Sequence, residues 1–471
     1  MKPFPALPYL SGNFAPLLAE CDANDLVIEG EMPKELNGAL YRIGPNPQFP
    51  PLGNSHHWFL GDGMVHALFI ENGRAAYRNR WVRTHQFNEE RAAGRRLYGA
   101  SFSPDSGDPS FAGKKRNVAN TNIVPHAGKL FAIDEGSSPV AIDPKSLETA
   151  GPWTFNGDYR GPMTAHPKID ARTGEMFFFG YMAGGPGSPD IAFNVVDAKG
   201  NLTQSETFTA PYAAMVHDFA ITDRHVIFPL FPATIDVQRI MKGGPVIAWD
   251  PDKGSHIGIM ARGAKTSEIR WFKGESVYVY HPLNAFSEGE RVVLDVMVYP
   301  RVPLFPNADG SREPRDLADA PAHLERWTFD LASNADGFKR EALDDLAAEF
   351  PRIDDRWTGL KHRHGYAGAI TGKMQPGSPF DTIVHYDLQH DERESWTPGV
   401  GDFVMEPVVA PRAADAGEAE GYVLTLVYRS NENRSDLVVL DAQDIARGPI
   451  ATAKLPVRVP FGFHGNWLAA A

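Results

Sequence analysis

Hydrophobic residues in this chain gather in short runs of about four to seven positions, and each run ends at a turn signal. β-Branched and aromatic residues dominate these runs, which is typical of strands. Segments rich in Asp, Gly and Asn, such as Asp197–Asn201 and Asp250–Gly254, separate them as in hairpins. We therefore predict strands at Gly38–Ile43, Lys129–Ile133, Glu175–Gly180, His225–Leu230, Val277–Tyr280, Val292–Val298 and Tyr422–Tyr428.

Helices are expected to be few, and the best short candidates are Glu341–Phe350 and Val237–Met241. Many short strands without intervening helices favour an all-β sandwich or a propeller. The chain shows neither a sharp repeat of about 40 residues nor a Trp-Asp signature, and seven blades would average about 67 residues each. Because no internal linker rich in Ser, Gly or Pro interrupts the pattern, we predict a single domain over residues 1–471.

Composition and charge narrow the class of protein. The 44 glycines and 39 prolines fit many tight turns, and 42% hydrophobic residues are enough for a large core. A net charge of −13 argues against nucleic-acid binding, which requires basic patches. Cys21 is the single cysteine of the sequence, so neither an intrachain disulfide nor a thiolate metal cluster can form.

The sequence also bears on location. Prolines interrupt the segment Met1–Pro8, where a signal peptide would carry an apolar stretch. No run of about 18 apolar residues is present, so we expect no membrane-spanning helix. A cytoplasmic protein is the expectation from these two observations.

Four of the 16 histidines stand in unusual sequence contexts. His166, His217, His281 and His464 each follow or interrupt an apolar run, where a bare imidazole needs a partner. They are separated by roughly 50, 60 and 180 residues, about one, one and three blades, and this spacing would let them converge on a central axis. For each histidine taken alone, a hydrogen-bonded packing role is the alternative, and the spacing leaves both interpretations open.

Several motifs together resemble one known family. Tyr41–Pro47, His57–Met64, Ala119–Thr121 and the four histidine contexts occur in the order typical of the carotenoid cleavage oxygenases. That family includes bacterial enzymes that cleave stilbenes and phenylpropenes, and the resemblance runs from about residue 30 to Trp467. It implies an all-β, seven-bladed β-propeller with loops and short helices capping the active-site face. It further implies one Fe(II) per chain, held by His166, His217, His281 and His464.

The resemblance also implies three glutamates that bind the outer nitrogens of iron-ligating histidines. By motif these are Glu135, Glu349 and Glu406. A carboxylate that accepts the outer N–H fixes both the tautomer and the ring orientation of the ligand. By chain order we pair Glu135 with His217, Glu349 with His281 and Glu406 with His464, which leaves His166 without such a partner.

The activity implied by the resemblance is oxidative cleavage of a carbon–carbon double bond by O2. Splitting one C=C bond into two carbonyls releases four electrons, and full reduction of O2 consumes four, so no organic cofactor is needed. The sequence accordingly carries no dinucleotide-binding glycine motif, no Walker loop and no serine-hydrolase elbow. An alternative of another class is a non-catalytic binding propeller in which the histidines pack or hold a structural metal. An isomerohydrolase relative is a further alternative, without specific support.

Substrate preference depends on a departure from the phenol-cleaving branch of the family. That branch typically holds the substrate hydroxyl with a tyrosine and a lysine, whose positions here fall on Ser101 and Asp134. A carboxylate would repel a phenolate, so we expect an apolar conjugated alkene such as an apocarotenal. The alternative is a phenylpropene or stilbene (isoeugenol, 4-vinylguaiacol or lignostilbene), cleaved to vanillin-like aldehydes. Tyr98, Phe59 and Phe286 complete the candidate substrate-binding residues.

An apolar entrance that touches membranes is common in the family. Leu304–Pro306 and Phe231–Ala233 are candidates for a peripheral membrane contact, and both fit buried turns equally well. The expected partners are therefore O2 and an apolar alkene, with no nucleic acid and no obligate protein partner.

Overall fold

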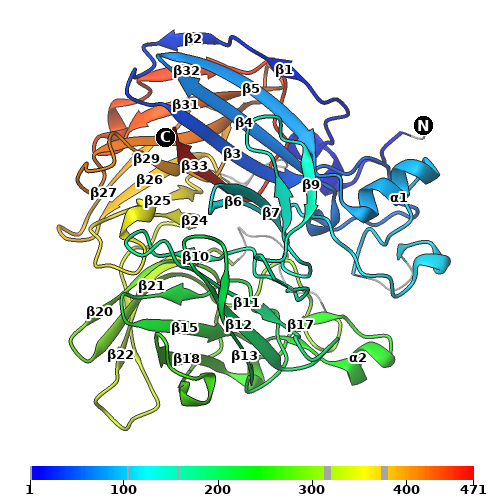
Figure 1. The fold of residues 1–471 in the computed structure, drawn as a ribbon, viewed down its shortest axis with the longest axis vertical. Coiled ribbons are helices and arrows are strands. Elements are labelled where there is room, and N and C mark those ends of the chain that lie inside the picture. Colours follow the sequence, from blue (N-terminus) through cyan, green and yellow to red (C-terminus); the bar gives the residue numbers. More distant parts are fainter. Residues whose placement is uncertain (1–2, 103–105, 158, 312–319, 373–379, 471) are drawn as a thin grey trace. The chain divides into compact units, whose positions relative to one another are not determined.

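The computed structural model describes residues 3–102, 106–157, 159–311, 320–372 and 380–470. Strands dominate it, and helices are short (Figure 1). The chain divides into two compact units, one of Met1–Thr154, Thr371–His385 and Arg393–Ala471, and one of Phe155–Ile370 and Tyr386–Glu392. A single domain over the whole chain stays a prediction. None of the helices in the described ranges is long and apolar enough to cross a membrane.

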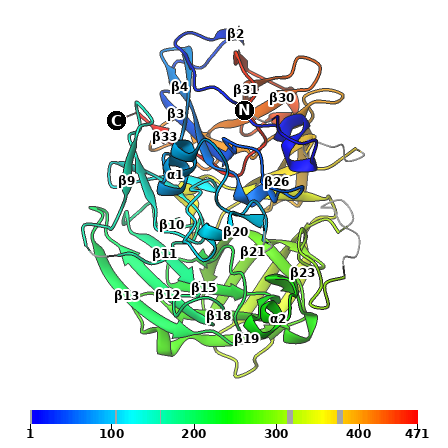
Figure 2. The same ribbon diagram turned by 90° about the vertical axis from the view of Figure 1, so that its right-hand side faces the viewer.

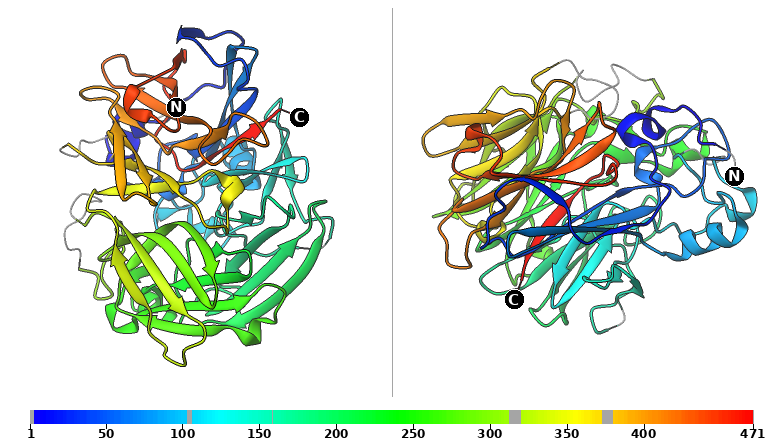
Figure 3. Two further views of the ribbon diagram at one scale, coloured as in Figure 1. Left: turned by 90° about the vertical axis from the view of Figure 1, so that its left-hand side faces the viewer. Right: turned by 90° about the horizontal axis from the view of Figure 1, so that it is seen from above.

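Three antiparallel sheets belong to the first unit. The first has the order β1-β5-β4-β3-β33, formed by Asp22–Ala23, Arg74–Trp81, Gly63–Glu71, Gly38–Pro45 and Gly465–Ala469. The second runs β6-β7-β8-β9 through Asn122–His126, Lys129–Ile133, Val140–Ile142 and Thr149–Pro152. The third runs β2-β32-β31-β30-β28, with β29 also on β30, through Val27–Gly30, Ala451–Lys454, Arg434–Asp441, Gly421–Arg429, Phe403–Val404 and Val408–Pro411. The C-terminal strand β33 thus pairs with β3 from the N-terminal region (Figure 3).

Three further four-stranded sheets belong to the second unit. One runs β10-β11-β12-β13 through Lys168–Ile169, Met176–Tyr181, Asp190–Val196 and Leu202–Thr209 (Figure 2). Another runs β14-β15-β18-β19 through Ala220–Ile221, His225–Leu230, Ser255–Ala261 and Arg270–Gly274. The third runs β20-β21-β22-β23 through Tyr278–Glu288, Arg291–Tyr299, His323–Asp330 and Lys339–Ala342. A two-stranded sheet joins β16 (Ala233–Ile235) to β17 (Ile247–Trp249).

One more four-stranded sheet runs β24-β25-β26-β27 through Ala348–Arg352, His364–Ala369, Thr382–Asp387 and Glu392–Trp396. The described residues therefore form seven sheets of four to six strands. Seven is the number of blades that the family resemblance implies. All seven strands predicted from the hydrophobic pattern are present. The ends of six differ by at most two residues, whereas β20 continues from the predicted end at Tyr280 to Glu288.

The helices correct one prediction and extend another. Val237–Met241 is helix α2, as predicted, and Asp236 caps it by accepting from the Gln238 amide. The helix expected at Glu341–Phe350 is wrong, because this segment ends β23 and begins β24. Cross-strand pairing with β22 and β25 outweighs the helix-like spacing of its leucines.

A helix that the hydrophobic pattern did not predict, α1, spans His85–Ala93. Thr84 caps its start by accepting from the Phe87 amide, and Gly94 ends it at a φ of 66°. The remaining helical segments within the described ranges are single 3₁₀ turns at Pro8–Leu10, Gly12–Phe14, Trp58–Leu60, Pro109–Phe111, Pro251–Lys253, Thr266–Glu268, Asp355–Trp357 and Ile445–Arg447.

Apolar side chains on the inner faces of neighbouring sheets form the core of each unit. In the second unit, the aromatic rings of Phe179, Phe193, Phe219 and Phe228 are buried together between β11, β12, β14 and β15. In the first unit, a cluster that includes Ile43, Ala67, Ile123 and Leu130 joins β3 and β4 to β6 and β7. These cores hold the strand ends from which the histidines project.

Gly180 shows how closely one histidine segment lies against its sheet. A Cβ atom at this position of β11 would lie 2.0 Å from the carbonyl oxygen of Pro162, four residues before His166. We expect Gly180→Ala to lower the free energy of unfolding by about 2 kcal/mol, because the 162–166 segment would have to move. Gly337→Ala is the control, since no described heavy atom lies within 4 Å of its Cβ position. Thermal and urea unfolding measure both, and equal stability of the two variants would contradict the packing.

Candidate metal centre

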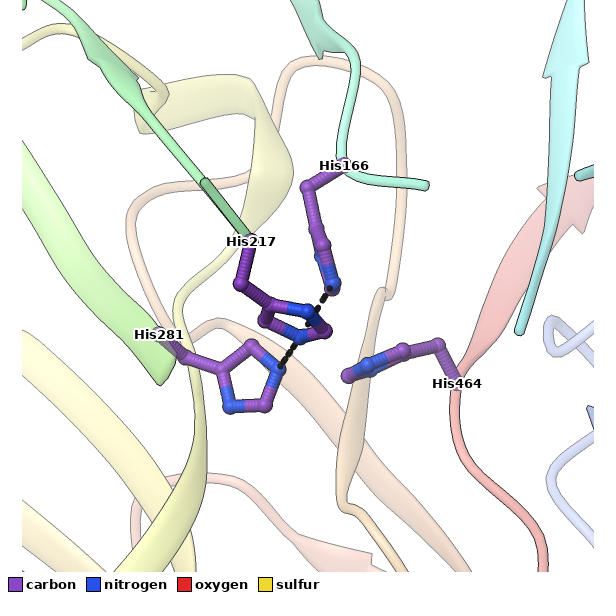
Figure 4. A group of neighbouring side chains, drawn as sticks. All are labelled: His166, His217, His281 and His464. Carbon is purple, nitrogen blue, oxygen red and sulfur yellow. Dashed lines mark hydrogen bonds between the residues drawn. The ribbon is translucent and has the colours of Figure 1, made fainter. Parts of the chain in front are cut away.

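Three histidines of the second unit point their rings at one another. The Nε2 atom of His217 lies 3.1 Å from the Nε2 atom of His166 and 3.1 Å from that of His281 (Figure 4). All three side chains are buried, with 6–8% of their surface exposed. Their ligand nitrogens lie within 4.8 Å of one another. Three imidazole nitrogens therefore share one small buried space.

Thr164 orients two of these histidines. Its hydroxyl accepts from the amide of His166 at 3.1 Å and donates to the carbonyl of His217 at 3.3 Å. The Thr164 amide in turn donates to the carbonyl of Phe179 on β11. The sequence Thr-Ala-His thus ties the loop before β10 both to its own sheet and to the segment before β14.

His281 is directed by an irregularity in its strand. The register between β20 and β21 shifts between Val279 and Pro282, so His281 lies in a bulge. Such bulges bend a strand and redirect a side chain out of the regular alternation. The Nδ1 atom of His281 lies 2.6 Å from the Oε2 atom of Glu349, and the His281 ring stacks on Phe350.

Glu349 is held in a similar way. The register between β24 and β25 shifts after Glu349, and Phe350 has a φ of 54°. This backbone turn lets the Phe350 amide donate to the same carboxylate oxygen that faces His281. Glu349 is 4% exposed, so its carboxyl group is shielded from solvent while its Oε2 atom faces His281.

His464 belongs to the first unit and directly precedes β33. Its amide donates to the carbonyl of Thr121, and its own carbonyl accepts from Ile43. The Nδ1 atom lies 2.8 Å from Glu406 Oε1, and the Glu406 Oε2 atom accepts from the Gly465 amide at 2.8 Å. Figure 4 shows the His464 ring projecting from the point where strand β33 begins.

The donor set fits a metal cation. A ring that donates its Nδ1 hydrogen to a carboxylate carries a lone pair on Nε2 when it is neutral. A single hydrogen on His217 Nε2 can serve only one of its two neighbours at a time, whereas a cation serves all three nitrogens. His166, His217, His281 and His464 are all buried, and each offers one nitrogen to a metal. Imidazole suits zinc, copper, iron and nickel.

Comparison with known proteins identifies the family. The family model described as retinal pigment epithelial membrane protein matches residues 14–469. The chain belongs to the carotenoid cleavage oxygenase family. The resemblance seen in the sequence and the predicted fold class, an all-β seven-bladed β-propeller, are both confirmed.

Relatives of two kinds match over nearly the whole chain. Isoeugenol monooxygenase of Pseudomonas nitroreducens is 39% identical over 471 residues, with 98% of each chain covered. Carotenoid cleavage oxygenase 1 of Neurospora crassa is 34% identical over 477 residues, covering 97% of this chain and 90% of that one. The crystal structure of Pseudomonas brassicacearum lignostilbene dioxygenase superposes with a TM-score of 0.94 at 40% identity, covering both chains fully.

Asp218 is an acidic residue beside His166 that was not among the residues predicted from the sequence. It follows His217 directly, is 4% exposed, and its Oδ2 atom lies 3.8 Å from Nδ1 of His166. Lys168 pairs with the other carboxylate oxygen at 2.8 Å. Burial raises the pKa of Asp218, and the lysine opposes that rise. No carboxylate partner of His166 is predicted from the sequence, and the fold brings Asp218 near it.

Two further predicted residues, Asp134 and Glu135, are adjacent in the chain. Glu135 is half-buried, and its pairing with His217 stays a prediction. Asp134 accepts from the Val118 amide and the Ser137 hydroxyl, and its Oδ1 atom has no hydrogen-bonding partner within the described ranges. Burial raises the pKa of Asp134 to about 6, so this carboxyl group is ionised in most molecules at neutral pH.

The candidate substrate-binding residues differ in their surroundings. Phe59 contacts the ring of Phe463, the residue before His464. The Tyr98 hydroxyl donates to Glu89 of α1 at 2.6 Å. This hydroxyl, which was predicted to contact a substrate, therefore already has a partner within the protein. Ser101 is half-buried and its hydroxyl lies 3.4 Å from that of Ser55. Phe286 lies five residues beyond His281 on β20 and packs at 6.1 Å from His362, beneath Arg326 and Lys361.

The two apolar turns considered for membrane contact are largely buried. Phe231 is 4% exposed and Phe305 is 8% exposed. These values agree with the buried-turn alternative at both places, and a membrane contact elsewhere stays a prediction.

The hydrogen bond from His281 to Glu349 gives a direct test. We expect Glu349→Gln to weaken metal binding about 10–100-fold, because a neutral amide no longer fixes the ring and its tautomer. Glu394→Gln is the matched control, since Glu394 accepts from His385 at 3.0 Å in a histidine–glutamate pair outside the predicted ligand set. Chelator competition with Co(II) measures both affinities. Unchanged affinity in Glu349→Gln, with the fold intact by circular dichroism, would contradict the assignment.

Proposed function

We propose that this protein is a non-haem Fe(II) dioxygenase that cleaves a carbon–carbon double bond of a conjugated alkene with O2, giving two carbonyl products. The observation that carries the proposal is the convergence of the His166, His217 and His281 Nε2 atoms, in a group of ligand atoms that includes no carboxylate from the described residues. Membership of an oxygenase family supports it. The non-catalytic alternative has no such support among the named relatives.

His464 supplies the fourth ligand in this proposal. The pairing of its Nδ1 atom with Glu406 repeats the pairing of His281 with Glu349 and leaves Nε2 for the metal. Two of the four ligands are therefore oriented by a buried glutamate. Glu135 takes the same role toward His217, as the motif suggests.

The spacing of the nitrogens would suit one shared cation. His217 Nε2 lies 3.1 Å from the Nε2 atoms of both His166 and His281. In this proposal His166, His217, His281 and His464 would hold Fe(II).

In this proposal the histidines bind the metal, and the glutamates orient the histidine rings and place negative charge beside them. When bound, Fe(II) supplies the capacity to bind and activate O2. The histidines are neutral ligands and preserve the full charge of the metal, while Glu349 and Glu406 hold their negative charges one hydrogen bond away. Burial of the rings keeps bulk water from the metal, which strengthens each electrostatic interaction.

An aryl-conjugated alkene of the phenylpropene or stilbene type is the substrate class we propose. The support is the 39–40% identity to isoeugenol monooxygenase and lignostilbene dioxygenase. Phe59 lies against Phe463 beside His464, where an aromatic ring of a substrate has a stacking partner.

An apocarotenoid is the second candidate substrate, and Asp134 favours it. This side chain is acidic and has one buried carboxylate oxygen without a partner among the described residues. A phenolate beside it would be repelled, whereas a polyene would not. The 34% identity to carotenoid cleavage oxygenase 1 of Neurospora crassa also supports this second candidate.

A product assay tests the proposed function. We expect Fe(II)-loaded protein to consume one O2 per alkene and to release two aldehydes from isoeugenol, a 4-hydroxystilbene or an apocarotenal, identified by mass. His217→Ala should abolish turnover, because it removes the proposed metal ligand whose Nε2 atom contacts those of both His166 and His281. His385→Ala, a buried histidine paired with Glu394, should retain it. Full activity of His217→Ala would contradict the proposal, as would the absence of products from iron-loaded, folded protein with all three classes.

A further inference from the structure

Arg42 is a buried arginine whose guanidinium group binds the two segments around His464. It lies on β3 and is 2% exposed. Its Nη2 atom donates to the carbonyl of Phe463 at 2.7 Å, and its Nη1 atom donates to the carbonyl of Glu406 at 3.0 Å. One planar side chain therefore joins the residue before His464 to the glutamate that binds the His464 ring.

The same guanidinium also faces the Glu406 carboxylate. Arg42 Nη1 lies 3.6 Å from Glu406 Oε2, and the two side chains are 2% and 1% exposed. A carboxylate that is buried without a nearby cation destabilises the fold, so Arg42 offsets the charge that Glu406 brings into the interior. Glu406 then uses Oε1 for the His464 ring and Oε2 for the Gly465 amide.

We propose that Arg42 is a positioning residue for His464, which it orients through Glu406 and through the Phe463 carbonyl. This inference rests on the proposed metal centre and extends it by one residue. Arg42 touches neither substrate nor metal in this account. It sets the direction in which His464 presents Nε2, because both the ring's partner and the preceding peptide are tied to one rigid group.

The geometry of arginine matters to this role. A guanidinium presents several N–H donors in a fixed plane, whereas a lysine ammonium is a single point charge. Arg42→Lys would keep the positive charge beside Glu406 but would lose the simultaneous bonds to two carbonyls. Its metal affinity should therefore fall between those of the wild type and Arg42→Met.

The first experiment measures Co(II) affinity of the full chain by chelator competition. We expect Arg42→Met to weaken binding about tenfold, at the lower end of losses seen when partners of metal ligands are removed. Arg458→Met is the matched control, because Arg458 is also buried and donates to the carbonyls of Asn13 and Ala15 instead. It should change the affinity less than twofold. Equal losses in both variants would show a general effect on packing and overturn the inference.

Double-mutant cycles separate positioning from a purely structural role. Arg42→Met should be strongly non-additive with Glu406→Gln, since both act on His464, and additive with Glu349→Gln, which acts on His281. Additivity in both cycles would overturn the inference. If Arg42→Met does not fold, Arg42→Lys takes its place in both cycles, with a loss of several-fold expected and wild-type affinity contradicting it.

The outcomes also distinguish this inference from the proposed function. Wild-type protein that binds no divalent metal would overturn both. Wild-type protein that binds Co(II), with unchanged affinity in folded Arg42→Met, would overturn the role of Arg42 alone. The visible spectrum of the Co(II) protein gives a second readout, because a displaced His464 should alter its absorption bands in Arg42→Met but not in Arg458→Met.

Discussion

The hydrogen bond between an imidazole Nδ1 atom and a buried carboxylate decides which nitrogen a histidine offers to a cation, and the account of this protein depends on it. His281 and His464 each make this bond, to Glu349 and Glu406. Because the outer nitrogen holds the hydrogen, the inner nitrogen carries the lone pair. Buried carboxylates are costly, so each needs further partners: the Phe350 amide for Glu349, and the Gly465 amide with Arg42 for Glu406.

The strands that carry these groups are irregular where the chemistry requires it. His281 and Glu349 both lie at register shifts, in β20 and β24. A regular strand alternates its side chains between two faces, so a bulge is a direct way to add an inward-pointing residue. The positive φ of Phe350 has the same effect, since it turns an amide toward the Glu349 carboxylate. The regular parts of the sheets supply the packed core that keeps these irregular positions in place.

Much of this could be predicted from the sequence, because strands and ligand motifs are local signals. The seven predicted strands followed from hydrophobic runs and turns, and the four histidines followed as a ligand set from the family resemblance that their sequence contexts help to carry. Arg42 and Asp218 could not be predicted in the same way. Arg42 meets Glu406 and Phe463 across 364 and 421 residues, and Asp218 approaches His166 only in the folded chain. The helix expected at Glu341–Phe350 is absent because pairing with the neighbouring strands β22 and β25 decides that segment. Helix α1 had local signals in Thr84 and Gly94, which the hydrophobic pattern alone did not use.

X-ray absorption at the iron K-edge of the purified, Fe(II)-loaded protein tests the central claim most directly. The account predicts about one iron per chain, surrounded by nitrogen or oxygen ligands at about 2.1 Å, with the multiple-scattering pattern of four imidazoles. It also predicts that His464→Ala lowers the imidazole count from four to three. An iron bound mainly by carboxylates, or a spectrum that is identical in wild type and His464→Ala, would contradict the four-histidine centre.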